Sequence, residues 1–172
     1  MTMQYDVKSG HLNQSGFVTQ GRVRLKQLTY AGNGGQAGYM IVFDTAIAPT
    51  AATYGRSGTT VTIASTAHGL ATGQTIGIGF GAASGASATD GNYTVTVVNA
   101  NSFTITDPNS GTIAGGTSCM YVTGPNLWVT AFDTLTGATG GQQVSIPGEG
   151  LLVLNGLYVF MSNITFVTAF YG

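Results

Sequence analysis

Tyr39-Met-Ile-Val-Phe-Asp44 is a continuous apolar run bounded by turn-forming residues. It is too short for a typical helix, and a run without alternation is typical of a strand that is buried on both faces. Leu127-Trp-Val-Thr-Ala-Phe-Asp133 has the same character, and Thr follows Asp in both runs. The similarity predicts that the two strands are neighbours in one sheet, with the chain between them in the place of a tight turn.

The stretch between these two runs has a different composition, rich in Thr, Gly, Ala and Ser. Polar and apolar residues alternate with period two in several of its segments, which predicts short strands. The segments are Thr60–Ala64, Thr75–Phe80, Tyr93–Val98 and Ser102–Thr106, with Cys119–Val122 as a candidate fifth strand. We therefore expect a discontinuous outer domain, residues 1–52 with 124–172, that carries an inserted small β-barrel, residues 53–123. A single continuous sandwich is the alternative.

Within the outer domain, residues 1–16 are polar and are expected to form an arm that orders only on a partner. Residues 142–161 are mostly strand-like, and Asn155-Gly156 predicts a type I′ hairpin turn within them. Residues 164–172 predict the last strand, and no segment favours a helix. The predicted fold class is all-β: a jelly-roll-like β-sandwich with an inserted small β-barrel.

The charge content is unusually low. Lys and Arg number five and Asp and Glu six, together 6% of the chain, where a soluble domain averages about 25%. A surface solvated mainly by Thr, Ser, Asn and Gly offers little repulsion against self-association. We expect neighbouring subunits to cover much of it; the alternative is an ordinary secreted domain with a neutral surface. The net charge of −1 argues against nucleic acid as a partner.

No apolar run reaches the roughly 18 residues of a membrane span, and the N-terminus does not resemble a signal peptide. We therefore expect a protein that is made in a cytoplasm, is not exported by the general route and has no membrane partner. Cys119 is the only cysteine, so an intrachain disulfide cannot form.

Seven residues are candidates for an interface. Arg22, Arg24 and Lys26 alternate along a predicted strand with Val23 and Leu25 facing a core, so the three cations share one face as an interface stripe or a solvated face. Glu149 lies between two glycines, which suggest a close approach of backbones, and we expect it to form an ion pair with that stripe. The remaining candidates are aromatic: Trp128, Phe170 and Tyr171.

Trp128 alternates with Leu127 and Val129, so a neighbouring chain could cover one face of its strand. A strand covered on both sides within one subunit explains the pattern equally well.

Catalytic and metal-binding patterns are weak. A catalytic or metal-binding His68 would need partners, and the only other histidine is His11, so we expect its ring to cap a turn beside Gly69. Asp44 and Asp133 could lie close together and hold Ca²⁺ if their strands pair, although such residues are more often turn-formers that bond the backbone. We expect no enzyme activity, no cofactor and no metal.

The alternating segments carry a resemblance. Val61-Thr-Ile-Ala-Ser-Thr-Ala-His-Gly-Leu70, Thr72-Gly-Gln-Thr-Ile-Gly-Ile78, Asp90-Gly-Asn-Tyr-Thr-Val-Thr-Val-Val98 and Asn101-Ser-Phe-Thr-Ile-Thr106 follow one another in order. Together they resemble a module repeated in many tailed-phage structural proteins. That module is similar to the small β-barrel inserted in the first catalytic-cysteine half-domain of ubiquitin-activating enzymes. The resemblance implies architecture and no chemistry.

Residues 145–159 and the terminal Ala169-Phe-Tyr-Gly172 resemble small virion proteins of phages that infect marine and aquatic bacteria. The resemblance implies a virion protein that binds the major capsid protein or other virion proteins. We expect a capsid decoration (cement) protein that stabilises the capsid lattice as a homo-oligomer, guessed to be a trimer. The alternative is a tail fibre, tail adaptor or adhesin that binds the host surface. Residues 81–91 and 107–117 contain no aromatic residue to stack on a sugar, which argues against an adhesin.

Overall fold

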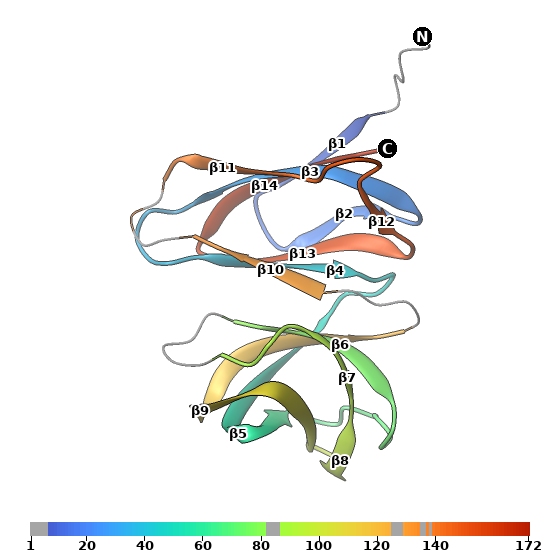
Figure 1. The fold of residues 1–172 in the computed structure, drawn as a ribbon, viewed down its shortest axis with the longest axis vertical. Helices are drawn as coiled ribbons and strands as arrows, with labels where there is room; N and C mark the ends of the chain where they lie inside the picture. The colour runs from blue at the N-terminus through green and yellow to red at the C-terminus, as the bar shows by residue number, and fades with distance from the viewer. Residues whose placement is uncertain (1–6, 82–86, 125–128, 135–136, 138) are drawn as a thin grey trace. The chain divides into compact units, whose positions relative to one another are not determined.

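The structure is a computed structural model that describes residues 7–81, 87–124, 129–134, 137 and 139–172. All regular elements within these residues are strands, which confirms the all-β prediction (Figure 1). Two compact units are present: residues 1–46 with 132–172, and residues 47–131. The second unit therefore interrupts the first in sequence, and it contains the whole of the segment 53–123.

Two sheets contain the strands that flank this interruption. They are β1 (Lys8–Leu12), β2 (Gly16–Gln20), β3 (Val23–Gly32), β4 (Tyr39–Asp44), β10 (Val129–Asp133), β11 (Gly141–Ser145), β12 (Leu151–Val153), β13 (Gly156–Ser162) and β14 (Ile164–Tyr171). One sheet has the order β1-β14-β3-β11, with β12 also paired to β3. The other has the order β10-β4-β13-β2.

These orders define a jelly roll. β11 and β12 both pair with β3, so they are two halves of one interrupted strand. The chain then passes through eight strand positions, and the two sheets read 1-8-3-6 and 5-4-7-2 in those positions. Two antiparallel sheets connected in this way are the double Greek key of a jelly roll. The predicted jelly-roll-like sandwich is therefore confirmed, and the second unit follows its fourth strand.

Strand β4 is the buried centre of its sheet. The four side chains from Met40 to Phe43 are all 0% exposed, as the continuous apolar run predicted. β4 lies between β10 and β13, so the two apolar runs are neighbours, also as predicted. Within the second run the described strand begins at Val129, and Leu127 and Trp128 lie outside the described residues.

The expected polar arm is only partly outside the fold. Residues 1–6 lie outside the described residues, but Lys8–Leu12 forms β1 at the edge of a sheet, paired with β14. His11 fixes this strand, because its Nδ1 lies 2.8 Å from the Thr168 hydroxyl and its ring stacks on Phe166. The arm prediction is therefore wrong for Lys8–Leu12. The polar side chains of an edge strand can face water while its backbone forms hydrogen bonds with the neighbouring strand.

Asn155-Gly156 does not form the predicted hairpin turn. β12 belongs to one sheet and β13 to the other, so Leu154 and Asn155 connect the two sheets. A type I′ turn needs positive φ at both central residues, and Asn155 does not have it. The buried Asp44 carboxylate holds this connection instead. It accepts hydrogen bonds from the amides of Leu154 at 3.0 Å, Asn155 at 2.8 Å and Gly156 at 3.4 Å.

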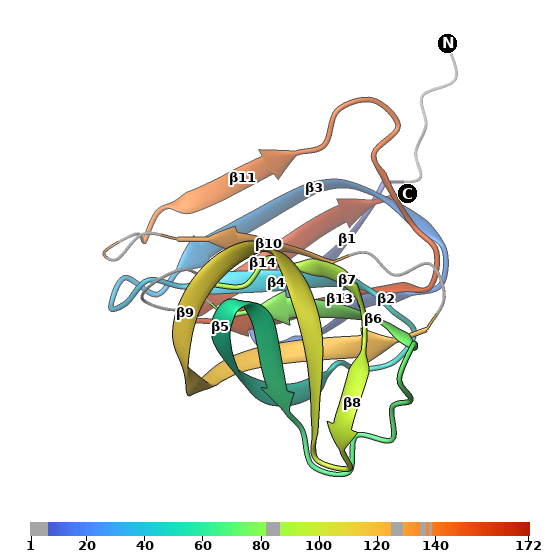
Figure 2. The same ribbon diagram turned by 60° about the horizontal axis from the view of Figure 1, so that its bottom comes forward.

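The second unit is one antiparallel sheet of five strands. These are β5 (Thr50–Ala64), β6 (Thr75–Phe80), β7 (Gly91–Thr94), β8 (Thr96–Asn99) and β9 (Ser102–Thr123). β5 and β9 pair along almost their whole length, with register shifts between Tyr54 and Arg56 and between Gly58 and Thr60. At these shifts the long pair curls over (Figure 2).

The curled β5–β9 pair encloses one core. Its two ends are extended by different strands, since β8 pairs with the start of β9 and β6 pairs with the end. Side chains from both ends pack into the same apolar cluster. The cluster includes Tyr54, Val61, Ile63, Ile76, Ile78, Phe80, Phe103, Ile105 and Tyr121.

Several short strands predicted for this unit are wrong in their limits. Thr60–Ala64 is the end of β5, and Ser102–Thr106 with Cys119–Val122 are the two ends of β9. The Gly- and Ser-containing segments next to them were not among the predicted strands, but the ladder continues through them with register shifts. Within the described residues the hydrogen-bonded order does not return to β5, so a closed barrel stays a prediction.

The Asp44 carboxylate should stabilise the jelly roll through the connection that it caps. In Asp44→Asn an NH₂ group replaces one acceptor oxygen and leaves a buried amide without its partner. We expect the free energy of unfolding to fall by about 1–3 kcal/mol, measured by urea denaturation. Asp133→Asn is the matched control, since Asp133 is exposed and its loss should change stability by less than about 0.5 kcal/mol. Equal stability of the two variants would contradict this role.

Candidate functional site

The outer face of the β1-β14-β3-β11 sheet carries no charge along two adjacent rungs. Strand register places the following residues directly across from one another: Ser9, Phe170, Gln27 and Ser145 in one rung, and His11, Thr168, Thr29 and Gln143 in the next. The residues that alternate with them, such as Leu28, Val167 and Ala169, are buried, so the rungs point away from the core. This face combines neutral hydrogen-bonding groups with the half-buried ring of Phe170.

One end of the same sheet is charged. Arg24 Nη2 lies 3.6 Å from Glu149 Oε2, so the ion pair predicted between Glu149 and the basic stripe is present within one chain. Lys26 Nζ also donates to the Glu149 backbone carbonyl at 2.7 Å. The Arg24 and Glu149 side chains are 39% and 85% exposed, so water screens the pair and it contributes little to stability, of order 0–1 kcal/mol.

A bulge in β3 and a loop opposite it shape this charged end. Tyr171 pairs with Leu25 and Phe170 with Gln27, so Lys26 is an extra residue between the inward-facing Leu25 and Leu28. The chain from 146 to 150 loops out between β11 and β12, beside the bulge. At Gly150, with φ +83°, a Cβ would lie 2.5 Å from the Leu25 carbonyl oxygen. This glycine therefore permits the close backbone approach that the sequence suggested.

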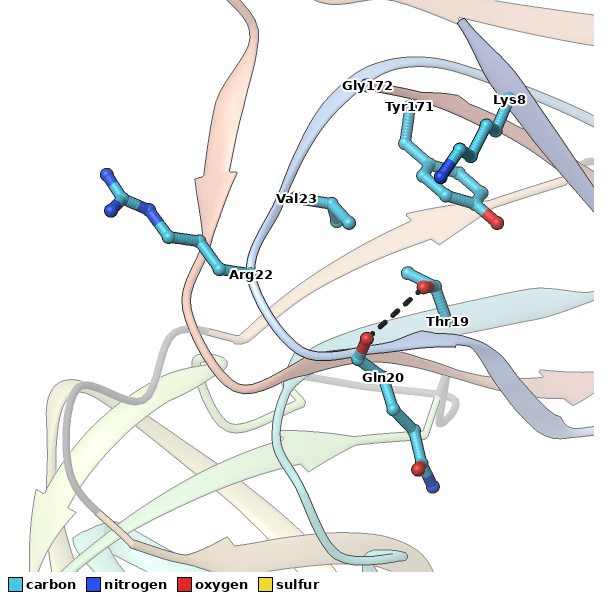
Figure 3. Close-up of a pocket in the computed structure, with 7 residues that line it drawn as sticks. All are labelled: Lys8, Thr19, Gln20, Arg22, Val23, Tyr171 and Gly172. Carbon is cyan, nitrogen blue, oxygen red and sulfur yellow. Dashed lines mark hydrogen bonds between the residues drawn. The ribbon is translucent and has the colours of Figure 1, made fainter. Parts of the chain in front are cut away.

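A pocket of about 320 Å³ opens at the same end of the sheet (Figure 3). Its lining residues are Lys8, Thr19, Gln20, Arg22, Val23, Tyr171 and Gly172. Lys8 lies beside Tyr171, its partner across β1 and β14, whereas the Arg22 side chain extends away from the pocket. The walls thus offer hydroxyl, amide and ammonium groups around an aromatic ring.

The structure places most of the interface candidates in one region. Arg24, Lys26 and Phe170 lie on the outer face of the sheet, Glu149 contacts Arg24 and Lys26 from the loop between β11 and β12, and Arg22 and Tyr171 line the pocket at the end of the sheet. Trp128 lies outside the described residues. The sequence did not indicate the pocket, because its walls come from both ends of the chain.

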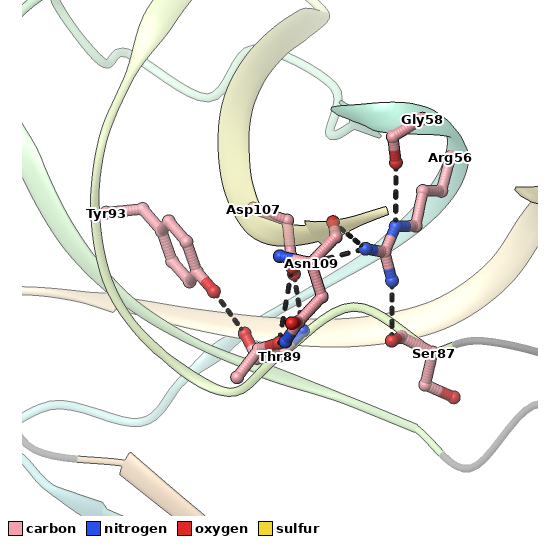
Figure 4. Close-up of polar contacts among 7 residues, drawn as sticks. All are labelled: Arg56, Gly58, Ser87, Thr89, Tyr93, Asp107 and Asn109. Carbon is pink, nitrogen blue, oxygen red and sulfur yellow. Dashed lines mark hydrogen bonds and ion pairs between the residues drawn. The ribbon is translucent and has the colours of Figure 1, made fainter. Parts of the chain in front are cut away.

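A buried polar network in the second unit was not anticipated (Figure 4). Arg56 and Asp107 form an ion pair of 3.2 Å with side chains 1% and 0% exposed. Arg56 also donates to three backbone carbonyls: Nε to Gly58 at 3.1 Å, Nη1 to Ser87 at 2.7 Å, and Nη2 to Asn109. Arg56 lies where β5 changes register, so its guanidinium holds the bend of the curled strand.

Asp107 completes this network on the other side. Its oxygens accept from the Thr89 amide at 2.5 Å, the Thr89 hydroxyl at 3.2 Å and the Asn109 amide at 2.7 Å. The Tyr93 hydroxyl donates to the Thr89 carbonyl at 2.6 Å. Burial, then the Asp107 and Asp90 charges, raises the pKa of Tyr93 to about 12, so the phenol remains a neutral donor. Backbone and side-chain groups of the same unit bond both the Arg56 guanidinium and the Asp107 carboxylate, so the network has a structural role.

Removing one partner of this pair should be costly, because the other would remain buried and charged. For Asp107→Asn we expect a loss of about 3–5 kcal/mol in unfolding free energy, measured by urea denaturation. The double variant Arg56→Met/Asp107→Asn should recover much of that loss, since no buried charge remains and position 107 keeps an acceptor oxygen for the Thr89 and Asn109 groups. A single variant as stable as the wild type would show that the pair does not hold the bend.

His68 caps a turn, as predicted. Its Nδ1 accepts from the Leu70 amide at 3.0 Å, so the proton lies on Nε2, which donates to the Asn99 carbonyl at 2.8 Å. The ring packs edge-on against Phe103 at 5.2 Å. Both ring nitrogens are therefore engaged with backbone groups.

Asp44 bonds backbone amides, which is the use that the sequence favoured over a Ca²⁺ site, but the amides differ from those expected. It bonds amides of residues 154–156, far along the chain, rather than amides two residues on. Asp133 is exposed on β10. In the described part of the chain, no group of three or more His, Cys, Asp or Glu residues could hold a metal ion.

Cys119 is an unreactive thiol. It is 2% exposed in the core of the second unit, and burial raises the pKa of its thiol to about 12. The thiolate is the nucleophilic form, so the folded protein holds very little of it at neutral pH. We expect iodoacetamide at pH 8 to label Cys119 only as fast as the unit unfolds. Intact-mass spectrometry measures the rate of labelling. Labelling in native buffer as fast as in urea would contradict this burial.

Comparisons with protein-family models, with curated proteins and with solved structures find no match to this chain. Among the described residues, no helix is long and apolar enough to cross a membrane.

Proposed function

We propose that this chain is a structural virion protein, a capsid decoration (cement) protein that stabilises the lattice of the major capsid protein as a homo-oligomer. The observation that carries the proposal is the uncharged outer face of the β1-β14-β3-β11 sheet. Eight residues in two rungs present hydroxyl, amide, imidazole and aromatic groups with no Lys, Arg, Asp or Glu among them.

Such a face suits permanent contact with another protein. Burying a charge costs free energy unless a partner meets it, whereas hydroxyl and amide groups can exchange water for hydrogen bonds across an interface. Aromatic rings such as Phe170 supply apolar area at low entropic cost. A stable interface buries about 1,600 Å² in total, which the outer face of a four-stranded sheet can supply together with its neighbours.

The fold agrees with this role, because jelly rolls occur in capsid proteins as well as in lectins and enzymes. Four polar side chains of kinds that often carry chemistry have structural partners instead: Asp44, Arg56, His68 and Asp107 each bond neighbouring protein groups. This supports a binding protein over an enzyme.

Copy number in the particle tests the proposal directly. We expect quantitative mass spectrometry of purified virions to find this chain in a fixed, high ratio to the major capsid protein, because a cement protein occupies repeated lattice positions. Particles that lack the chain should release their contents at a lower temperature, and adding it back should reverse the change. A handful of copies per particle would instead indicate a tail fibre, adaptor or adhesin. Its absence from virions would refute the proposal.

A further inference from the structure

Four of the five Lys and Arg side chains of this protein lie at one end of one sheet. The fifth, Arg56, is buried in its ion pair with Asp107. Lys8 and Arg22 line the pocket, Arg24 exchanges backbone hydrogen bonds with Gly172 at the pocket wall, and Lys26 follows on β3. We call these four residues, Lys8, Arg22, Arg24 and Lys26, the cationic end. It therefore contains every surface cation of the chain.

Few carboxylates oppose the cationic end. Asp44 and Asp107 are buried, and the Asp133 side chain lies on the other sheet. Asp6 lies outside the described residues. Among the carboxylates that the structure describes, Glu149 alone contacts the cationic end, through an exposed pair with Arg24 that is weak enough to exchange for another partner. Within the described residues, Lys8 and Arg22 form no ion pair and no side-chain hydrogen bond. Three of the four cations thus have no carboxylate partner there.

We propose that the cationic end docks an acidic segment of a protein on the particle surface, with one carboxylate side chain entering the pocket beside Lys8. This inference rests on the proposed function and names the contact that orients the chain. A carboxylate in the pocket would meet the Lys8 ammonium and the Tyr171 hydroxyl, whereas the Gln20 side-chain amide points away from both (Figure 3). The neutral face around Phe170 would then cover the adjoining, uncharged part of the same partner.

The arrangement favours a polypeptide over nucleic acid. Four cations beside an aromatic and polar face are too few for a phosphate track, and the chain has a net charge of −1. Because the surface elsewhere carries few charges, the field of the cationic end is the main electrostatic guide for an approaching partner. Such fields act chiefly on the rate and orientation of association, and salt screens them.

The test measures association of the full-length protein with particles assembled without it, at low and at high salt. Lys8→Gln/Arg22→Gln removes two cations that the fold does not use, and we expect association at low salt to slow about tenfold. Glu149→Gln should speed it, because the local carboxylate is lost. Asp133→Asn changes the net charge by the same amount as Glu149→Gln but lies on the other sheet, and should leave the rate unchanged. At high salt all four proteins should converge.

The outcomes separate this inference from the proposed function. If the wild type does not attach to particles at any salt concentration, the proposed function fails and this inference with it. If the wild type attaches but Lys8→Gln/Arg22→Gln attaches at the same rate, only the acidic docking fails. Equal acceleration by Glu149→Gln and Asp133→Asn would attribute the effect to net charge and would also overturn it. Attachment to duplex DNA with the same dependence on Lys8 and Arg22 would reassign the cationic end to nucleic acid.

Discussion

The pairing of β3 on both of its edges is the constraint on which the first unit depends. β14 pairs with one edge of β3, and β11 and β12 pair with the other edge. β3 therefore connects the last strand of the chain with β11 and β12 in one sheet. Its inward residues Leu25, Leu28 and Tyr30 enter the core, and its outward residues set the rungs of the neutral face. The bulge at Lys26 lets both Leu25 and Leu28 face inward. Because this strand carries Arg24 and Lys26, the same ladder positions the cationic end.

Each of the two units contains a buried carboxylate that is stabilised by backbone amides. In the jelly roll, the Asp44 carboxylate is buried and three backbone amides satisfy it. In the second unit, Asp107 is buried and is met by Arg56 and by backbone amides. Each group replaces regular strand pairing at a place where the chain changes sheet or bends. Some of the few charges of this chain thus serve as internal supports and four cations gather at one exposed end, while none lies on the two rungs of the neutral face.

Local pattern explains why part of the fold was predictable. The apolar run Tyr39–Asp44 could only be stable if covered on both faces, and the alternation at Arg22–Lys26 assigned Leu25 to the core. The Glu149–Arg24 pair followed from the scarcity of charges, because Glu149 had few partners to choose from. The Asn155-Gly156 hairpin was wrong because a turn propensity does not state whether the strands on either side share a sheet. Arg56 escaped notice since it lies before the alternating segment Thr60–Ala64 and belongs to none of the predicted strands.

The sequence by itself determined the all-β class, the low charge and the apolar strand β4, because these depend on composition and on neighbours within a few residues. Only the tertiary structure decided the jelly-roll order, the continuity of β5 and β9, and the pocket. These features join residues far apart in the sequence: Lys8 with Tyr171 and Asp44 with Asn155 are more than a hundred positions apart, and Thr50 of β5 is 71 positions from Tyr121 of β9. Such contacts are selected by the packing of the whole core, and no local pattern encodes which distant strand will supply the partner.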